Sequence, residues 1–239
     1  MKYLIKKRNA SGIRNALVSV VVIFFLVSCG TNKKETNPAE ELPFANDIRN
    51  FKKQDSISAP PQNAILFIGS SSFTKWTDVQ NNFPGYTIIN RGFGCSTLPD
   101  LIRYEKDIIF PYHPKQIVIY CGENDLASSD SVTAIMVFDR FKELFGMIRE
   151  KFADIPIAYI SMKPSPSRRH LFSKMREGNQ LIKKFLASQK NTAFIDVHEQ
   201  MLNEAGEPIP EIYLEDSLHM NAKGYAIWQK EIQPYLLKD

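Results

Sequence analysis

The sequence has few of the residues that bind metals or cross-link small folds. Three of its 239 residues are cysteines and four are histidines. No two cysteines have the close spacing of a zinc-binding pair, and no segment repeats along the chain. The sequence therefore predicts no metal site, no bound cofactor and no repeat architecture.

Most of the chain also lacks a net basic charge. The whole sequence has a formal charge of +4, but residues 1–28 contain five of the cations and no acidic residue. Removing them leaves a charge of −1 for the remainder. The basic isoelectric point therefore belongs to the N-terminal segment, and we expect no nucleic-acid partner.

No apolar run is long enough to span a bilayer comfortably. The apolar run at residues 16–27 follows a segment with five basic residues. A basic segment and a short apolar run are typical of a secretory signal peptide, so we predict that residues 1–28 are removed. An uncleaved N-terminal membrane anchor is the alternative.

The predicted signal ends in LVSC, Leu26 to Cys29, which resembles a bacterial lipobox. In such sequences a peptidase cleaves before the cysteine, and the thiol is lipidated. Residues 29–43 are mostly polar and have the composition of a flexible tether. The resemblance implies a lipoprotein of the cell envelope, anchored through Cys29 to a bacterial membrane on its periplasmic or surface side.

Residues 44–239 form the predicted folded domain, in which short apolar runs alternate with longer periodic segments. Phe44, Ile48 and Phe51 recur at helical spacing and predict a first helix. The short runs are rich in Ile, Val, Phe or Tyr, as in strands covered on both faces. The predicted strands are residues 64–68, 87–90, 116–120, 157–160 and 193–196. Further helices are predicted at 98–110, at 132–152 after an N-cap at Ser131, at 171–188, at 199–203, and at 222–237 after an N-cap at Asn221.

Strands that alternate with long crossovers indicate a parallel sheet with helices on both faces. The predicted fold is a three-layer α/β/α sandwich around a central, mostly parallel five-stranded sheet. Ligands of such sheets bind beyond the carboxyl ends of the strands. The segments at these ends read GSSS, RGFG, CGEND, SMKPSPSRRH and VH. Three of them place glycine beside small or polar residues, which suits tight turns with exposed backbone N–H groups.

Two cysteines, Cys95 and Cys121, lie in the predicted domain. An exported protein can keep a disulfide. Two small buried thiols are the alternative that we favour, because the sequence does not show whether the two Cα atoms approach each other.

Two of the four histidines have surroundings that argue against a role as general base, and a third has two interpretations. His113 lies between two prolines at the opposite end of the sheet, and we expect it on the surface. Two arginines precede His170 and disfavour its protonation. His198 follows the fifth strand together with Asp196. That pair is interpreted either as polar residues at a helix start or as a second acid–base or metal site.

The fourth histidine, His219, follows Asp216 by three residues on a loop just before the last helix. At this spacing the carboxylate can accept a hydrogen bond from the ring N–H and fix the tautomer of the imidazole. An imidazole held in this way can take the proton of a serine hydroxyl, which is otherwise a poor nucleophile.

The blocks GSSS, RGFG, GEND and DSLH occur in this order between Gly69 and His219, each after a predicted strand or before the last helix. Together they resemble the SGNH hydrolase superfamily, also called GDSL esterases. The resemblance implies a serine esterase that works through an acyl-serine. Ser70 and Ser72 stand where the family has Asp and Leu, so three serines allow the alignment to shift by one residue.

By this resemblance, Ser71 is the nucleophile, His219 the base and Asp216 the group that orients the base. The backbone N–H groups of Ser71 and Gly92 and the side-chain amide of Asn124 form the implied oxyanion hole. Glycine leaves its N–H uncovered, and an amide donates without adding a charge.

The substrate is less defined by the sequence. Short connections after the first three strands favour small acyl groups, such as acetyl esters of carbohydrates. Lys163, Arg168 and Arg169 are interpreted either as contacts for an anionic group of the substrate or as a solvated basic loop, and Asp125 as structural. A lysophospholipase or thioesterase, an acyltransferase, and a catalytically silent glycan- or lipid-binding lipoprotein remain alternatives. The sequence does not indicate whether the protein is a monomer or an oligomer.

Overall fold

The computed structural model describes residues 41–239 of the chain. Within them, five strands form one parallel sheet in the order β2-β1-β3-β4-β5. The predicted α/β fold is confirmed, and each predicted strand is found within two residues of its expected bounds. The strands are β1 (Ile65–Gly69), β2 (Ile88–Gly92), β3 (Gln116–Tyr120), β4 (Ile157–Ile160) and β5 (Thr192–Ile195).

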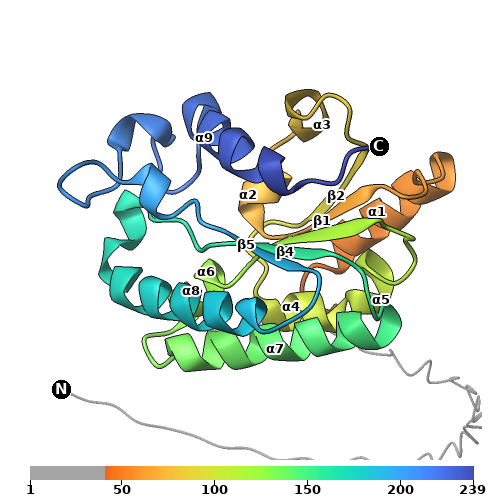
Figure 1. Ribbon diagram of the computed structural model, residues 1–239, viewed down its shortest axis with the longest axis horizontal. Helices are drawn as coiled ribbons and strands as arrows, with labels where there is room; N and C mark the ends of the chain where they lie inside the picture. The colour runs from red at the N-terminus through yellow and green to blue at the C-terminus, as the bar shows by residue number, and fades with distance from the viewer. Residues whose placement is uncertain (1–40) are drawn as a thin grey trace, which may run out of the picture. The chain divides into compact units, whose positions relative to one another are not determined.

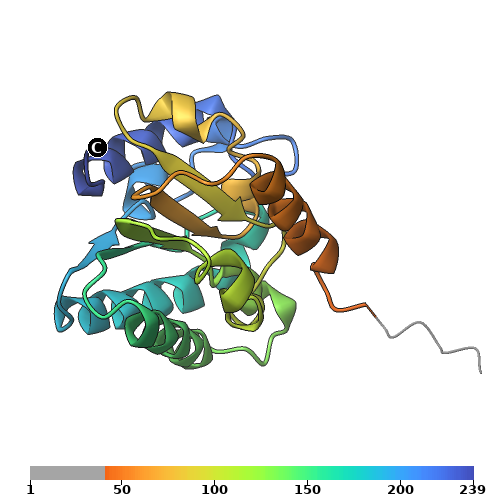
Figure 2. The same cartoon turned by 90° about the vertical axis from the view of Figure 1, so that its right-hand side faces the viewer.

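Helices cover both faces of this sheet (Figures 1 and 2). Side chains alternate along β1, so that Ile65 and Phe67 pack in one apolar cluster while Leu66 and Ile68 pack in the other. The first cluster lies under α2 (Ser71–Thr74), α3 (Val79–Asn82) and α9 (Ala222–Ile232). The second lies under α1 (Ala45–Ile57), α4 (Leu98–Arg103), α5 (Glu105–Ile108), α6 (Glu123–Ser128), α7 (Ala134–Lys151) and α8 (Phe172–Ala187).

Helix bounds differ from the prediction where local geometry interrupts the apolar pattern. The predicted helix at 98–110 is divided at Tyr104 into α4 and α5. Thr133 caps α7 in place of Ser131, because its hydroxyl accepts a hydrogen bond from the N–H of Met136 at 3.2 Å. Asn221 caps α9 as predicted. The predicted helix at 199–203 is a short 3₁₀ turn, Glu199–Met201, and another, Gln233–Tyr235, follows α9 at a proline.

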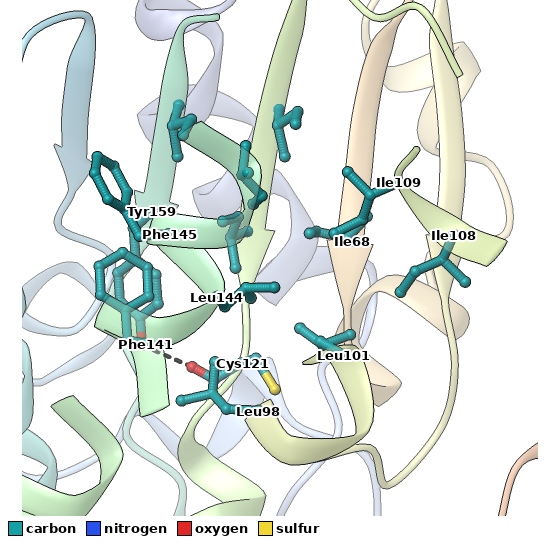
Figure 3. Close-up of a cluster of buried hydrophobic side chains, with 14 of the residues drawn as sticks. Ile68, Leu98, Leu101, Ile108, Ile109, Cys121, Phe141, Leu144, Phe145 and Tyr159 are labelled. Carbon is teal, nitrogen blue, oxygen red and sulfur yellow. Dashed lines mark hydrogen bonds between the residues drawn. The ribbon is translucent and has the colours of Figure 1, made fainter. Parts of the chain in front are cut away.

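The two cysteines of the domain are free thiols and form no disulfide with each other. Cys121 follows β3 and lies in the apolar cluster near Leu98 (Figure 3), where its backbone carbonyl accepts a hydrogen bond from the Tyr159 hydroxyl at 2.7 Å. Cys95 is exposed. The alternative of two buried thiols therefore holds for Cys121 alone.

The predicted signal peptide at 1–28, the lipidated Cys29 and most of the tether at 29–43 lie outside the described residues. These assignments stay predictions. Among residues 41–239, no helix has the length and apolar character needed to cross a membrane.

Candidate active site

Ser71 opens helix α2 directly beyond the carboxyl end of β1, where the chain turns sharply. Gly69 makes this turn with a φ of 151°, and a Cβ at this position would lie 2.0 Å from the carbonyl oxygen of Tyr120. Ser70 and Ser72 are both buried, whereas Ser71 is half-buried. Of the three serines, only Ser71 has its hydroxyl in contact with an imidazole, which favours Ser71 as the nucleophile predicted by the alignment.

His219 and Asp216 reach this serine from a loop that precedes α9. Nε2 of His219 lies 3.0 Å from Oγ of Ser71, and Nδ1 lies 2.6 Å from Oδ2 of Asp216. A short bridge between Tyr213 and Met220 closes the base of the loop. The carbonyl of His219 also accepts the N–H of Leu214 at 2.8 Å, so both ends of the loop are held together.

The carboxylate of Asp216 is fixed in its charged form by the loop that carries it. Desolvation pushes its pKa upward, but hydrogen bonds from the His219 ring and from the backbone N–H groups of His219 and Leu218 lower the pKa well below its ordinary value. The two backbone bonds to Oδ1 measure 2.9 and 3.0 Å. Oδ2 is left to accept the proton on Nδ1, which presents the Nε2 lone pair to the serine.

Asn124 brings its side-chain amide to the same end of the sheet from the first turn of α6. Its Nδ2 donates to the carbonyl of Ser96 at 3.0 Å, and its Oδ1 accepts from Nη2 of Arg168 at 2.8 Å. Because Nδ2 carries two hydrogens, one N–H remains for another acceptor. Asp125, the next residue, is fully buried; its carboxylate accepts from the Leu98 N–H at 3.0 Å and pairs with an arginine of α7, so the predicted structural role is supported.

Gly92 does not have the free N–H expected of it. Its N–H donates to Oδ1 of Asn90 at 2.9 Å. A Cβ on Gly92 would lie 2.5 Å from Cβ of Phe73, so this glycine lets α2 pack closely on β2. The prediction of Gly92 as an oxyanion donor is therefore corrected: the position serves close packing, a second common reason for glycine that the sequence alone could not separate from the first.

The loop after β2 offers another backbone donor, the N–H of Cys95, three residues after Gly92. Ser96 fixes this loop between two parts of the site, because its hydroxyl donates to the Gly69 carbonyl at 3.1 Å and its carbonyl accepts from Asn124. Cys95, the residue before Ser96, has a φ of 63°. Within residues 41–239, neither the N–H of Cys95 nor that of Ser71 donates to a protein acceptor.

Two of the three basic residues after β4 pair with a buried carboxylate instead of facing solvent. Lys163 is 1 % exposed, and its Nζ lies 3.0 and 3.1 Å from the two carboxylate oxygens of Glu123. Arg168 contacts the same carboxylate. Only Arg169 is exposed to solvent, where it pairs with Glu207. The solvated-loop interpretation is therefore wrong for Lys163 and Arg168.

Glu123 was not identified from the sequence, although it is the centre of this buried network. The Tyr120 hydroxyl also donates to it. Burial alone would raise the pKa of Glu123, but Lys163 and Arg168 outweigh that effect and lower the pKa. Burial in turn lowers the pKa of Lys163. The available signal was a lysine three residues after a strand buried on both faces, since a lysine buried there needs a buried partner.

The remaining histidines lie away from Ser71 or lack a suitable partner. His113 and His170 are exposed. His198 is 2 % exposed, and its Nδ1 lies 2.9 Å from the Met162 carbonyl. Asp196 lies instead 3.8 Å from Nζ of Lys183, so it does not form an acid–base pair with His198. No group of three metal-ligating side chains occurs in the described part of the chain, so His198 and Asp196 do not belong to such a cluster.

Taken together, the strand ends of β1 and β3 and the loop before α9 bring Ser71, Asn124, Asp216 and His219 to one edge of the sheet. A hydroxyl in contact with an oriented imidazole can attack an electrophilic carbonyl. Hydrogen-bond donors nearby can stabilise the negative charge that develops on its oxygen. The arrangement is therefore suited to acyl transfer.

Comparisons with known proteins agree with this geometry. The sequence pattern of the GDSL-like Lipase/Acylhydrolase family matches residues 55–227. No curated protein matches the chain.

Solved structures share the fold at low sequence identity. A candidate platelet activating factor from Streptococcus pneumoniae is 21% identical with a TM-score of 0.70, over 80% of this chain and 92% of that one. A GDSL-like lipase from Bacteroides thetaiotaomicron is 19% identical with a TM-score of 0.65, over 78% and 95% of the two chains. A catalytic mutant of an acetylxylan esterase from Geobacillus stearothermophilus is 16% identical with a TM-score of 0.58, over 74% and 95%.

The family pattern spans well over half of the chain, from the last part of α1 into α9, and therefore includes the segments that carry Ser71, Asn124, Asp216 and His219. At this end of the sheet Ser71, His219 and Asp216 are in direct contact, and Ser96 connects the Asn124 amide to the Gly69 carbonyl at the end of β1. The chain belongs to the GDSL-like lipase/acylhydrolase family.

Proposed function

We propose that this protein is a serine esterase that hydrolyses small acyl esters, most of all acetyl esters of carbohydrates, through an acyl-serine intermediate. The observation that carries the proposal is the contact between Nε2 of His219 and Oγ of Ser71, with Nδ1 of the same ring held by Asp216. A serine in contact with an oriented base is the constellation that acyl transfer requires.

In the proposed first step, Oγ of Ser71 attacks the ester carbonyl carbon while Nε2 of His219 takes the hydroxyl proton. The carbonyl oxygen becomes an oxyanion, which accepts hydrogen bonds from the Ser71 N–H and from Nδ2 of Asn124. The N–H of Cys95 replaces that of Gly92 as the third donor, because it lies on the loop between Gly69 and Asn124 and has no acceptor in residues 41–239.

In the remaining steps His219 first acts as an acid toward the leaving alcohol and then as a base toward water. The imidazolium of His219 gives its proton to the leaving alkoxide, and the tetrahedral intermediate collapses to an ester between the acyl group and Ser71. His219 then takes a proton from water, the hydroxide attacks the acyl carbon, and the carboxylic acid leaves as Ser71 regains its proton. Asp216 stays ionised throughout and stabilises the imidazolium.

The acetyl-carbohydrate preference is supported by one of the structural relatives, which is an acetylxylan esterase. The lipid anchor predicted at Cys29 would place the domain at a bacterial membrane, so lysolipids are the second substrate class to test. The proposal is tested with a panel of acetylated glycans, short-chain esters and lysolipids, assayed with wild type and Ser71→Ala.

Turnover of acetyl esters by wild type, lost in Ser71→Ala, supports the proposal. A preference for lysolipids would contradict the proposed substrate class and leave the assignment of Ser71 as nucleophile unchanged. Esters appearing on an added sugar acceptor would identify an acyltransferase. A folded wild-type protein with no turnover, and no burst of product from an activated acetyl ester, would favour a binding protein on this fold.

A further inference from the structure

Arg168 contacts the proposed oxyanion donor directly, from a turn that follows β4. Its Nη2 lies 2.8 Å from Oδ1 of Asn124, and its side chain is 16% exposed. An arginine can only donate hydrogen bonds, so the amide oxygen of Asn124 must face the guanidinium. The Nδ2 group then faces the opposite way.

The second neighbour of the amide imposes the same orientation. Nδ2 donates one hydrogen to the carbonyl of Ser96 at 3.0 Å, and a carbonyl can only accept. If the amide of Asn124 rotated by half a turn, an oxygen would replace a donor at the oxyanion and face the Ser96 carbonyl as well. The interaction that favours the transition state would become a repulsion.

A buried carboxylate fixes Arg168 in turn. Nη1 of Arg168 lies 3.1 Å from Oε1 of Glu123, which is 4 % exposed. Lys163 and Tyr120 hold the same carboxylate from the strand ends of β4 and β3. An arginine that contacts two acceptors through its two terminal nitrogens has its plane fixed, which a single ammonium group could not match.

The turn that carries Arg168 is also hydrogen-bonded to the loop before α9, which carries Asp216 and His219. The N–H of Ser167 donates to the carbonyl of Ser217 at 3.1 Å, and Ser217 lies between Asp216 and His219. The hydroxyl of Tyr213 donates to the carbonyl of Pro164 on the same turn. The segment after β4 is therefore connected both to the oxyanion side and to the base side of the site.

We propose that Arg168, clamped by Glu123, is a positioning residue of the esterase reaction: it keeps the Asn124 amide turned so that Nδ2 faces the developing oxyanion. The inference rests on the proposed function. It assigns Arg168 no contact with the substrate, so its effect must pass through Asn124.

The test is a double-mutant cycle on hydrolysis of p-nitrophenyl acetate, a small neutral ester. Arg168→Ala is expected to lower kcat by about 10- to 100-fold and to change KM by less than about threefold. The loss of kcat is smaller than for removal of an oxyanion donor, because the Asn124 amide is still present but no longer held in one orientation. In an Asn124→Ala background, the same substitution is expected to change kcat by less than about threefold, because the amide it orients is gone.

Arg169→Ala is the matched control, since this neighbouring arginine is exposed and pairs only with Glu207 among the acidic residues of the described chain. It should retain the wild-type kcat. Thermal melts accompany every variant. If Arg168→Ala does not fold, Arg168→Met, which keeps the apolar stem of the side chain, replaces it in the same cycle.

Three results would overturn the proposal: a folded Arg168 variant with wild-type kcat, a raised KM at unchanged kcat, or an equal loss of kcat in the presence and absence of the Asn124 amide. Each would leave the esterase proposal intact as long as wild type is active and Ser71→Ala is not. An inactive wild type would instead contradict the proposed function itself.

Discussion

Nε2 of His219 lies 3.0 Å from Oγ of Ser71, although 148 residues separate the two in the chain. The contact depends on the parallel sheet. Ser71 follows the first strand, whereas the loop of His219 is anchored beside the last helix, which packs on the same face of the sheet as α2. The Tyr225 hydroxyl of α9 donates to the Ser72 carbonyl at 2.9 Å and ties the two elements directly.

Replacing Asp216 by asparagine should lower kcat by a factor on the order of 10³ to 10⁴, because the amide no longer stabilises the imidazolium or selects the tautomer with the Nε2 lone pair toward Ser71. The measurement is steady-state hydrolysis of p-nitrophenyl acetate. Glu215→Gln, a change at the exposed acidic neighbour, is the control and should leave kcat unchanged. Equal values of kcat for Asp216→Asn and wild type would show that Asp216 does not orient His219 for the reaction.

Asn124→Ala should lower kcat by about 10²- to 10³-fold with little change in the melting temperature, because one oxyanion donor is lost. The adjacent Asp125→Ala should show the opposite pattern. It leaves Arg140 without its partner and an N–H of α4 without its acceptor, so we expect a loss of about 3 kcal/mol in the free energy of unfolding. An Asn124→Ala protein that unfolds early while its kcat persists would contradict this division.

His198 should make the stability of the protein sensitive to mild acid. Burial lowers its pKa below the ordinary 6.5, and the Met162 carbonyl, Glu199 and Asp196 offset this only in part, while Arg176 adds to it. The unfolded chain therefore binds a proton before the folded one does. The stabilising contribution is complete above the unfolded pKa and is lost as the pH falls through the folded pKa.

Chemical unfolding at about pH 7.5 and about pH 5 measures this effect. The free energy of unfolding of wild type should fall over this range, and that of His198→Asn should fall less. His113→Asn is the matched control because His113 is exposed, and it should keep the wild-type dependence. Identical dependence in wild type and His198→Asn would show that His198 is not the residue responsible.

The two thiols of the domain should react very differently. Cys95 is exposed and Cys121 is buried in the apolar cluster, where burial also raises its pKa well above the ordinary value. Alkylation of the folded protein, followed by peptide mass mapping without reduction, should label Cys95 and leave Cys121 unlabelled until denaturant is added. A peptide pair joined through Cys95 and Cys121 would contradict the structure.

The sheet could be predicted from the sequence because its strands are buried on both faces. Residues 116–120 and 157–160 are apolar nearly throughout, and β3 and β4 have these same bounds. The order of the blocks also predicted that Ser71 and Asn124 lie together, since residues that follow parallel strands meet at one edge of the sheet. The block before the last helix placed His219 with them.

The errors arose where a residue's role depends on what packs against it. Gly92 carries no sign in the sequence that Phe73 lies above it or that Asn90 accepts its N–H. Lys163 and Arg168 resembled surface residues because their partner, Glu123, lies 40 or more positions away in the chain. Contacts between neighbouring strand ends decide these roles, and no local pattern encodes them.

The identity of the nucleophile tests the proposed mechanism most directly. Wild type is treated with a fluorophosphonate, and the modified residue is mapped by mass spectrometry, with Ser70→Ala and Ser71→Ala treated in parallel. We predict one adduct, on Ser71, present in wild type and in Ser70→Ala and absent from Ser71→Ala, together with loss of esterase activity wherever the adduct forms. An adduct on Ser70 or Ser72, or wild-type turnover by Ser71→Ala, would contradict the assignment of Ser71 as the nucleophile.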